Sequence, residues 1–140
     1  MSNSARNVAS LVGRMLMCWI FIYSAWGQIV EFNYWANRAT QKGIPFGAAA
    51  IVASITIQLL GGIAVLVGAQ IRIASVALFA FLIPTTLIFH NFWTLQGPAR
   101  EPQIINFSRN LAIMGGLLFV SMLGAGDYSV DAMRSAKYKH

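Results

Sequence analysis

The stretch FGAAAIVASITIQLLGGIAVLVGAQIRIASVALFAFLIPTTLIFHNFW, residues 46–93, contains a single charged residue, Arg72. The turn residues Gly68-Ala69-Gln70 divide it into two apolar runs, residues 46–67 and 71–93. A helix that crosses a bilayer needs about 20 predominantly apolar residues. Each run supplies one such helix, and the tight turn between them predicts an antiparallel hairpin inside a membrane.

Two further apolar runs flank this hairpin. No Asp, Glu, Lys or Arg occurs between Arg14 and Glu31, or from Asn110 to Gly126. With flanking residues included, these runs predict spans at residues 8–30 and 103–123. The chain is 57% apolar and 10% charged, whereas a soluble domain carries about 25% charged residues. This composition excludes a soluble globular domain and a disordered chain.

The predicted fold class is all-α: an integral membrane four-helix bundle of up-down-up-down topology, in a single domain over residues 1–140. Only helices and closed barrels satisfy backbone hydrogen bonds in lipid, and these runs are too long and too continuously apolar for barrel strands. Residues 31–45 mix aromatic and basic side chains, which predicts a short interfacial segment between the first two spans. Residues 124–140 form a polar tail that is ordered at most in part.

The charge distribution predicts a lipid bilayer as partner and no nucleic acid. The net charge is +6, and the basic residues sit at span ends and in the tail, where anionic headgroups lie. Arg14 and Arg72 are expected to reach such headgroups. Basic residues favour the cytoplasmic side, and the side that holds both termini carries more of them, which predicts cytoplasmic termini. That side holds Arg6, Arg14, Arg72, Arg134, Lys137 and Lys139, against Arg38, Lys42, Arg100 and Arg109 on the other.

Cysteine and histidine are too scarce for several kinds of site. Cys18 is the single cysteine and lies inside the first span, so an internal disulfide, a CxxC redox pair and a zinc knuckle are excluded. The two histidines are His90 and His140, the last residue. A haem held by two histidines of one bundle and a structural metal site are therefore not expected, nor is any covalently bound cofactor.

Polar side chains from three spans fall at one predicted depth, in the third of the bilayer opposite the termini. They are Gln28 of the first span, His90 and Asn91 of the third, and Arg109 and Asn110 of the fourth. Glu31 is expected above this cluster, and Gln58 below it, near mid-bilayer. Such groups are costly inside a membrane and are therefore candidates for function.

One interpretation of the cluster is a quinone site, because a quinone headgroup has two carbonyl oxygens that accept hydrogen bonds and a ring that stacks on aromatic side chains. In this reading the headgroup is held by His90, Asn91, Arg109 and Asn110, Trp93 stacks on the ring, Glu31 orients Arg109, and Gln28 and Gln58 are further contacts. The alternative is structural: Trp93 belongs to an interfacial aromatic belt, Arg109 turns outward or pairs with Glu31, and Gln58 makes an interhelical hydrogen bond. The sequence identifies no catalytic residue.

Several short motifs of the chain also occur together in one family. They are Gly13-Arg14, Phe21-Ile22-Tyr23-Ser24 with Gly27, Gly43-Ile44-Pro45, Leu59-Leu60-Gly61-Gly62, Gly68 with Arg72, His90-Asn91-Phe92-Trp93, and Asn110-Leu111-Ala112-Ile113-Met114-Gly115-Gly116. Over residues 13–131 the chain thereby resembles the DoxX family of small four-span bacterial membrane proteins. Members of that family often have Lys where Gln28 stands and Glu where Gln58 stands, so the ion pair is replaced here by two neutral amides.

The resemblance implies redox work in the bacterial inner membrane, since the family takes its name from a subunit linked to thiosulfate:quinone oxidoreductase. The chain would then be a quinone-associated, oxidoreductase-type subunit with a soluble or membrane redox partner, and a homo-oligomer is a further option. A second hypothesis is a non-catalytic membrane scaffold or a carrier of a small solute or lipid. Such a protein would recruit a soluble partner through the tail, residues 127–140.

Overall fold

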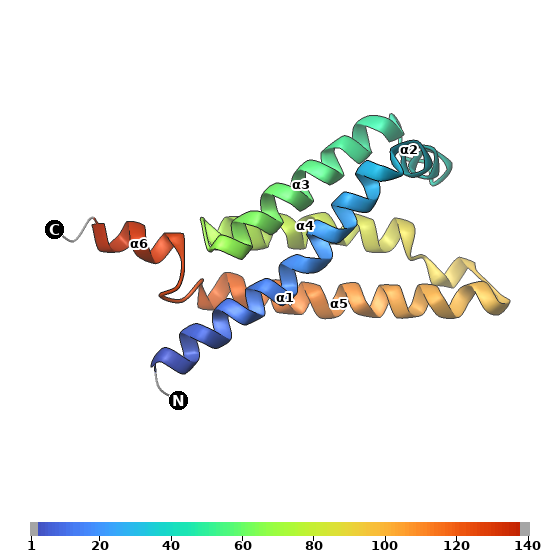
Figure 1. The fold of residues 1–140 in the computed structure, drawn as a ribbon. Coiled ribbons are helices and arrows are strands. Elements are labelled where there is room, and N and C mark those ends of the chain that lie inside the picture. The colour runs from blue at the N-terminus through green and yellow to red at the C-terminus, as the bar shows by residue number, and fades with distance from the viewer. Residues whose placement is uncertain (1–2, 138–140) are drawn as a thin grey trace.

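A computed structural model describes residues 3–137 as a bundle of four long helices (Figure 1). These are α1 (Asn3–Val30), α3 (Gly47–Val67), α4 (Ile71–Phe89) and α5 (Arg100–Leu123). The shorter helices are α2 (Phe32–Gln41), α6 (Val130–Lys137) and two 3-10 turns, η1 (Phe92–Thr94) and η2 (Gly97–Ala99). Successive long helices run antiparallel, and the part of the chain that the structure describes contains no strand.

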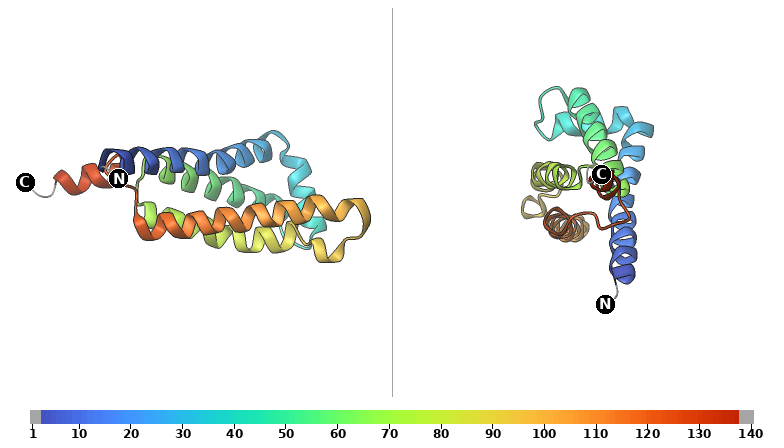
Figure 2. Two further views of the ribbon diagram at one scale, coloured as in Figure 1. Left: turned by 90° about the horizontal axis from the view of Figure 1, so that it is seen from below. Right: turned by 90° about the vertical axis from the view of Figure 1, so that its left-hand side faces the viewer.

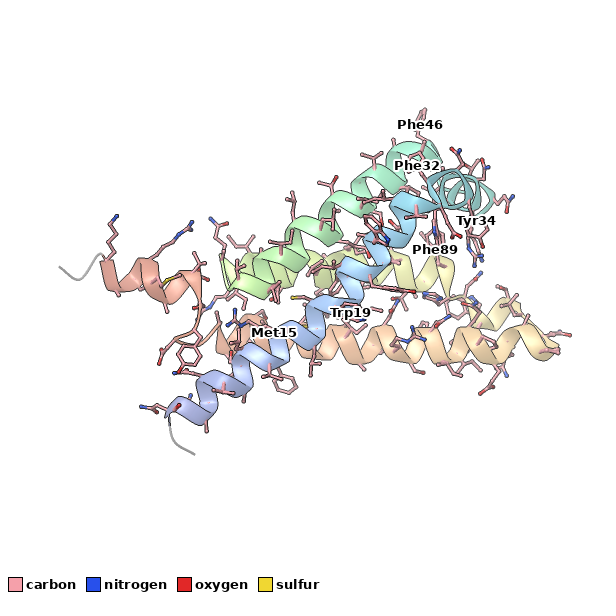
Figure 3. All side chains as sticks on the ribbon, viewed as in Figure 1. Met15, Trp19, Phe32, Tyr34, Phe46 and Phe89 are labelled. Carbon is pink, nitrogen blue, oxygen red and sulfur yellow. The ribbon has the colours of Figure 1, made fainter. Side chains whose placement is uncertain are left out.

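The predicted four-helix membrane architecture is confirmed. Four helical segments have the length and the hydropathy to cross a membrane. Many large apolar side chains face outward on them, including Leu16, Phe119 and Met122, which are 72–77% exposed. An apolar exterior of this extent is unusual for a protein in water and is what a bilayer requires. Phe46, at the tip of the hairpin between α2 and α3, points away from the bundle (Figure 3).

The helix bounds differ from the expected spans at three places. α1 begins at Asn3, so residues 3–7, which precede the expected span, are already helical. α4 ends at Phe89 and not at residue 93, because the backbone leaves the helix at His90 and turns into η1. α5 begins at Arg100, which makes Pro102 its third residue. Proline is tolerated there because the first N–H groups of a helix have no partner within it.

The helices meet where side chains are small. α3 packs against α1, α2 and α4, and α5 packs against α4. A Cβ at Gly61 would lie 2.8 Å from Leu78 of α4, so this glycine allows the two helices to approach closely. The buried core between them contains Cys18, Phe21, Val65, Leu78 and Leu117.

Arg14 does not reach lipid headgroups as predicted. Its side chain is 1% exposed and is turned into the bundle, where Nη1 donates to the Leu66 carbonyl oxygen at 2.8 Å and Nη2 donates to the Tyr128 carbonyl oxygen. Leu66 lies in the last turn of α3, where a helix leaves carbonyl oxygens without a partner, and Tyr128 lies in the loop before α6. Protein carbonyls therefore take the place that lipid phosphates were expected to take, whereas Arg72 is exposed, as its predicted role requires.

Part of the polar tail forms a helix. Residues 130–137 form α6, which extends beyond the end of the bundle (Figure 2). Asp131 accepts hydrogen bonds from the backbone N–H groups of Gln70 at 2.8 Å and Ile71 at 3.0 Å. It thus caps the first turn of α4 from a distant part of the sequence. Lys139 and His140 lie outside the described residues.

Replacing Asp131 with alanine is expected to lower the free energy of unfolding by about 1 kcal/mol, the usual cost of losing a helix cap. Because the same side chain holds α6 against the turn before α4, trypsin should also cut faster after Arg134. Thermal unfolding in detergent and timed proteolysis measure the two effects. Ser135→Ala is the control, since Ser135 is exposed and bonds only within its own helix. Equal cleavage of the two variants would contradict the capping role.

Candidate functional site

Two adjoining cavities lie inside the bundle at the end opposite the termini, where α2 crosses over α3. Their volumes are about 380 Å³ and about 210 Å³, and the larger falls in the range of small-molecule sites. α1, α2, α3, α4 and α5 all contribute to their walls. The residues that line both are Ser24, Gln28, Trp35, Phe81, Thr85, His90 and Asn106.

α1 and α3 supply a chain of neutral polar groups. Gln58 of α3 is 3% exposed, and its Nε2 donates to Ser54 Oγ at 2.9 Å and to Gln28 Oε1 of α1 at 3.3 Å. Both glutamines border the smaller cavity. Gln58 therefore makes an interhelical hydrogen bond and also lies in the wall of the candidate site.

α4 and α5 supply the opposite wall. His90, the residue that ends α4, has its Nδ1 2.8 Å from Gln103 Oε1 of α5. Because the amide oxygen accepts, the N–H of the imidazole is at Nδ1 and donates to it. Nε2 takes no part in this hydrogen bond. Asn110 donates to Thr86 Oγ1 at 3.0 Å. His90 and Arg109 both border the smaller cavity, as the cluster hypothesis requires.

α2 places two unpaired donors against the larger cavity. Trp35 Nε1 and Arg38 Nε are both buried and have no hydrogen-bond partner. The Arg38 guanidinium lies 5.8 Å from the centre of the Trp35 ring, and Nη1 donates to the Tyr34 hydroxyl at 2.9 Å. A buried donor without a partner is costly. Both residues line the larger cavity, so a ligand bound there is the candidate to supply the missing acceptors.

A close approach of α2 to α3 fixes these donors in place. A Cβ at Gly47, the first residue of α3, would collide with the Ala36 carbonyl oxygen and the Thr40 hydroxyl. Phe32 of α2 and Phe89 of α4 both pack against the buried cluster of Ala36, Ala39 and Ile51, and Phe89 is labelled below α2 in Figure 3. The interfacial segment is therefore a packed helix, and it forms part of the site.

Three predicted site residues lie outside both cavities. Asn91 Oδ1 accepts a hydrogen bond from Lys42 Nζ at 2.9 Å. Trp93 is 53% exposed and packs edge-on against Phe107, with ring centres 6.1 Å apart. Glu31 is exposed, and within residues 3–137 it forms no ion pair with Arg109, whose Nη2 instead donates to Asn106. Because α4 ends at Phe89, the chain turns away before it reaches Asn91 and Trp93.

The sequence interpretation missed several polar lining residues: Ser24, Arg38, Ser54, Thr85, Gln103 and Asn106. A signal for most of them was present. Ser24 and Ser54 each lie four residues before a glutamine of the cluster, on the same helix face. Gln103, Asn106 and Asn110 likewise follow one another at spacings of three and four, which places a polar stripe on one side of α5.

Neither cavity is lined by an Asp or Glu side chain among the described residues, and these residues contain no group of three His, Cys, Asp or Glu that would hold a metal ion. The walls combine donors with aromatic rings from Trp35, Phe81 and Phe89. Such a site favours a planar or apolar ligand that carries hydrogen-bond acceptors.

Comparison with known proteins identifies relatives that are membrane proteins. The family model for DoxX matches residues 9–91. Two similar proteins of Escherichia coli are inner membrane protein YphA, 27% identical over 128 residues and 91% of each chain, and inner membrane protein YqjF, 30% identical over 132 residues, which are 94% of this chain and 96% of the relative. The ER-derived vesicles protein ERV29 of Saccharomyces cerevisiae is 32% identical over 78 residues, 56% of this chain and 25% of the relative. No solved structure matches the chain.

Proposed function

The chain belongs to the DoxX family of integral membrane proteins, and on this premise we propose that it is a quinone-associated subunit of a redox system in the bacterial inner membrane, one that acts on a sulfur compound such as thiosulfate. The site of the quinone is the double cavity beneath α2. The observation that carries the proposal is the pair of unpartnered donors, Trp35 Nε1 and Arg38 Nε, on the wall of that cavity.

The donors match the acceptors of a quinone headgroup. Each of its two carbonyl oxygens accepts hydrogen bonds and donates none, so it pairs with groups that the protein leaves unbonded. Trp35 and Arg38 approach from α2, and His90 approaches from α4. A ligand that presents only donors to α2 would leave Trp35 Nε1 and Arg38 Nε without acceptors. A buried polar group left unpaired in this way discriminates strongly against such a ligand.

The walls also suit a flat ring. Trp35 and Phe89 face the larger cavity, and Phe81 borders both cavities. Aromatic side chains favour stacked or edge-on contacts with another ring. The site lies at one end of the membrane-spanning helices, where an apolar carrier can enter from lipid while its headgroup remains near the polar surface.

A bound quinone would carry two electrons and two protons between redox partners. Residues of this chain would hold it and manage the protons. His90 is the one histidine among the lining residues, and a neutral imidazole carries one nitrogen that donates a proton and one that accepts. With Nδ1 committed to Gln103, Nε2 is the atom that can exchange a proton with a ligand oxygen. Electrons would come from a partner protein or directly from a substrate.

Trp35→Phe is expected to weaken the binding of a short-chain quinone about five- to tenfold, because it removes one buried hydrogen bond and keeps an aromatic ring. Purified protein is titrated with the quinone, and free ligand is measured by its absorbance. Trp93→Phe is the matched control, since Trp93 lies outside both cavities, and its dissociation constant should stay within about twofold.

The outcomes separate the proposal from the scaffold or carrier alternative. Loss of affinity in Trp35→Phe and in His90→Ala, with Trp93→Phe unchanged, supports a quinone site. Equal affinity in all four proteins contradicts it. Retention of an apolar solute or lipid in place of the quinone would favour a carrier.

A further inference from the structure

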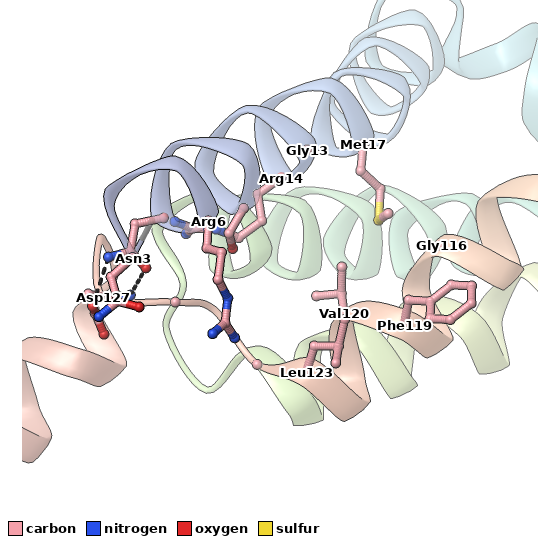
Figure 4. A pocket seen from close by; sticks show the side chains of 14 residues that line it. Asn3, Arg6, Gly13, Arg14, Met17, Gly116, Phe119, Val120, Leu123 and Asp127 are labelled. Carbon is pink, nitrogen blue, oxygen red and sulfur yellow. Dashed lines mark hydrogen bonds between the residues drawn. The ribbon is translucent and has the colours of Figure 1, made fainter. Parts of the chain in front are cut away.

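A second cavity system lies at the opposite end of the bundle, on the side of the two termini. It is a groove of about 710 Å³ between the N-terminal half of α1 and the C-terminal half of α5 (Figure 4). α1 packs on α3 and crosses the line of α5 at an angle (Figure 1), which leaves space between α1 and α5. Nothing in the double cavity contributes to it, so it is independent of the proposed quinone site.

The groove has a polar end and an apolar end. Toward the terminus of α1 it is lined by Asn3, Arg6, Asn7 and Ser10, and deeper in the bundle by Met17, Phe119, Val120 and Leu123. Figure 4 shows the Arg6 side chain extending from α1 toward α5. Polar groups at the surface end and apolar groups at membrane depth follow the layering of a phospholipid.

The electrostatic balance of the polar end favours an anion. Arg6 is exposed and makes no hydrogen bond or ion pair with another residue of 3–137. Arg14, at the back of the groove, is 1% exposed, and its Nε has no partner. Asp127 is the one acidic residue in the lining, and it is engaged by Asn7, whose Nδ2 donates to it at 2.7 Å.

The floor of the groove leaves room for a chain. A Cβ at Gly13 would meet no atom within 4 Å, and at Gly116 it would meet the flexible end of Met17 at 2.6 Å. Gly13 thus borders open space, whereas the space beside Gly116 is occupied by the end of the Met17 side chain. The alternative occupant is a second copy of this protein. It would have to place a helix in the same space with an anionic group beside Arg6, whereas a phospholipid needs only one acyl chain and its phosphate.

We propose that this groove binds one anionic phospholipid from the leaflet on the side of the termini. The phosphate lies beside Arg6, with the charge of buried Arg14 behind it, and one acyl chain lies along Gly13, Met17 and Phe119. An anion at this place also compensates the Arg14 charge, which is otherwise neutralised by carbonyl dipoles alone.

The test measures lipid retained by the purified full-length protein. Protein in neutral detergent is titrated with phosphatidylglycerol or with phosphatidylcholine, and bound lipid is counted by native mass spectrometry. Arg6→Gln should weaken phosphatidylglycerol binding about fivefold, the effect of one basic residue near an anionic lipid. Arg72→Gln is the matched control, because Arg72 is exposed at the same end of the bundle and does not line the groove.

A second pair of variants tests the shape of the groove without changing its charge. Gly13→Phe fills open space inside the groove, whereas Gly27→Phe fills open space on the same helix outside it. Gly13→Phe alone should reduce the retained phosphatidylglycerol at least fivefold. Because a Cβ added at either glycine would meet no atom within 4 Å outside its own helix backbone, loss of folding does not account for a difference between them.

Three results would overturn the proposal. The first is equal retention of phosphatidylglycerol and phosphatidylcholine. The second is an equal loss in Arg6→Gln and Arg72→Gln, which would indicate a diffuse basic surface. The third is displacement of the lipid by millimolar inorganic phosphate, which would indicate a site for the free anion.

Discussion

Replacing Arg14 with methionine is expected to lower the free energy of unfolding by about 2–4 kcal/mol, because two carbonyl oxygens lose a charged donor and each buried acceptor left without a partner costs about 1–3 kcal/mol. Methionine fills much of the same volume, so the expected loss comes from polar contacts and not from a cavity. Few single changes in the chain should have a larger effect on stability.

The reason lies in what Arg14 joins. Its guanidinium donates to the carbonyl oxygens of Leu66, at the end of α3, and Tyr128, just before α6. In Arg14→Met both oxygens remain buried without this donor. Gly68 lies beside the same side chain, where an added Cβ would be 2.7 Å from Nη1. The arginine therefore holds three separate segments of the chain at one point.

The measurement is unfolding by a denaturing detergent in a neutral, lipid-free micelle, so that bound lipid does not contribute. Arg14→Lys should recover only part of the loss, because an ammonium cannot reach two carbonyl groups with the fixed fork of a guanidinium. Arg72→Met should change stability by less than about 0.5 kcal/mol, as is usual at an exposed site. Equal stability of Arg14→Met and Arg72→Met would show that the buried contacts carry no net stabilisation.

The position of the helices could be predicted because the bilayer imposes a length on them. The run between Gly68 and the end of α4 illustrates the limit of that reasoning. Hydropathy extends it to Trp93, but hydropathy does not report where the backbone leaves the helix, and the structure shows this at His90. Asn91 and Trp93 were assigned to the site for this reason and lie outside it.

The depth of a side chain was predictable, but its direction was not. Gln28, His90 and Asn110 lie at one level and do border the same cavity, because a rise per residue fixes height. Arg14 is expected from the sequence on the side of the termini, at lipid headgroups, yet its side chain turns inward to carbonyls contributed by residues 66 and 128. Those partners depend on how α6 packs against the bundle. The low hydropathy of the tail gives no indication of that packing.

The neutral pair formed by Gln28 and Gln58 gives the second large effect. Gln58→Glu alone is expected to lower the free energy of unfolding by about 2.5–3.5 kcal/mol, the insertion cost of a charged residue at the centre of a membrane helix. Gln58 is 3% exposed, so water cannot solvate the new carboxylate. Members of the family that the chain resembles often have Glu at this place, together with Lys at the place of Gln28.

Adding Gln28→Lys to Gln58→Glu should therefore restore part of the lost free energy of unfolding. The double variant should be more stable than the sum of the two single changes predicts. The two amides are already in contact, with Gln58 Nε2 3.3 Å from Gln28 Oε1, so an ammonium at one position can reach a carboxylate at the other. We expect a coupling of about 1–3 kcal/mol in a double-mutant cycle measured by unfolding in detergent.

A control cycle combines Gln58→Glu with Gln96→Lys, in which the lysine occupies an exposed position on the loop between η1 and η2. Those two changes should add without coupling, because the new charge at residue 96 remains in solvent. Additivity in both cycles would mean that α1 and α3 cannot bring the two charges together, and that the neutral amides of this chain occupy a geometry different from the ion pair of its relatives. Coupling in the first cycle alone would mean that the bundle retains the geometry of the ion pair and that this chain has replaced two charges by one neutral hydrogen bond in the wall of its ligand site.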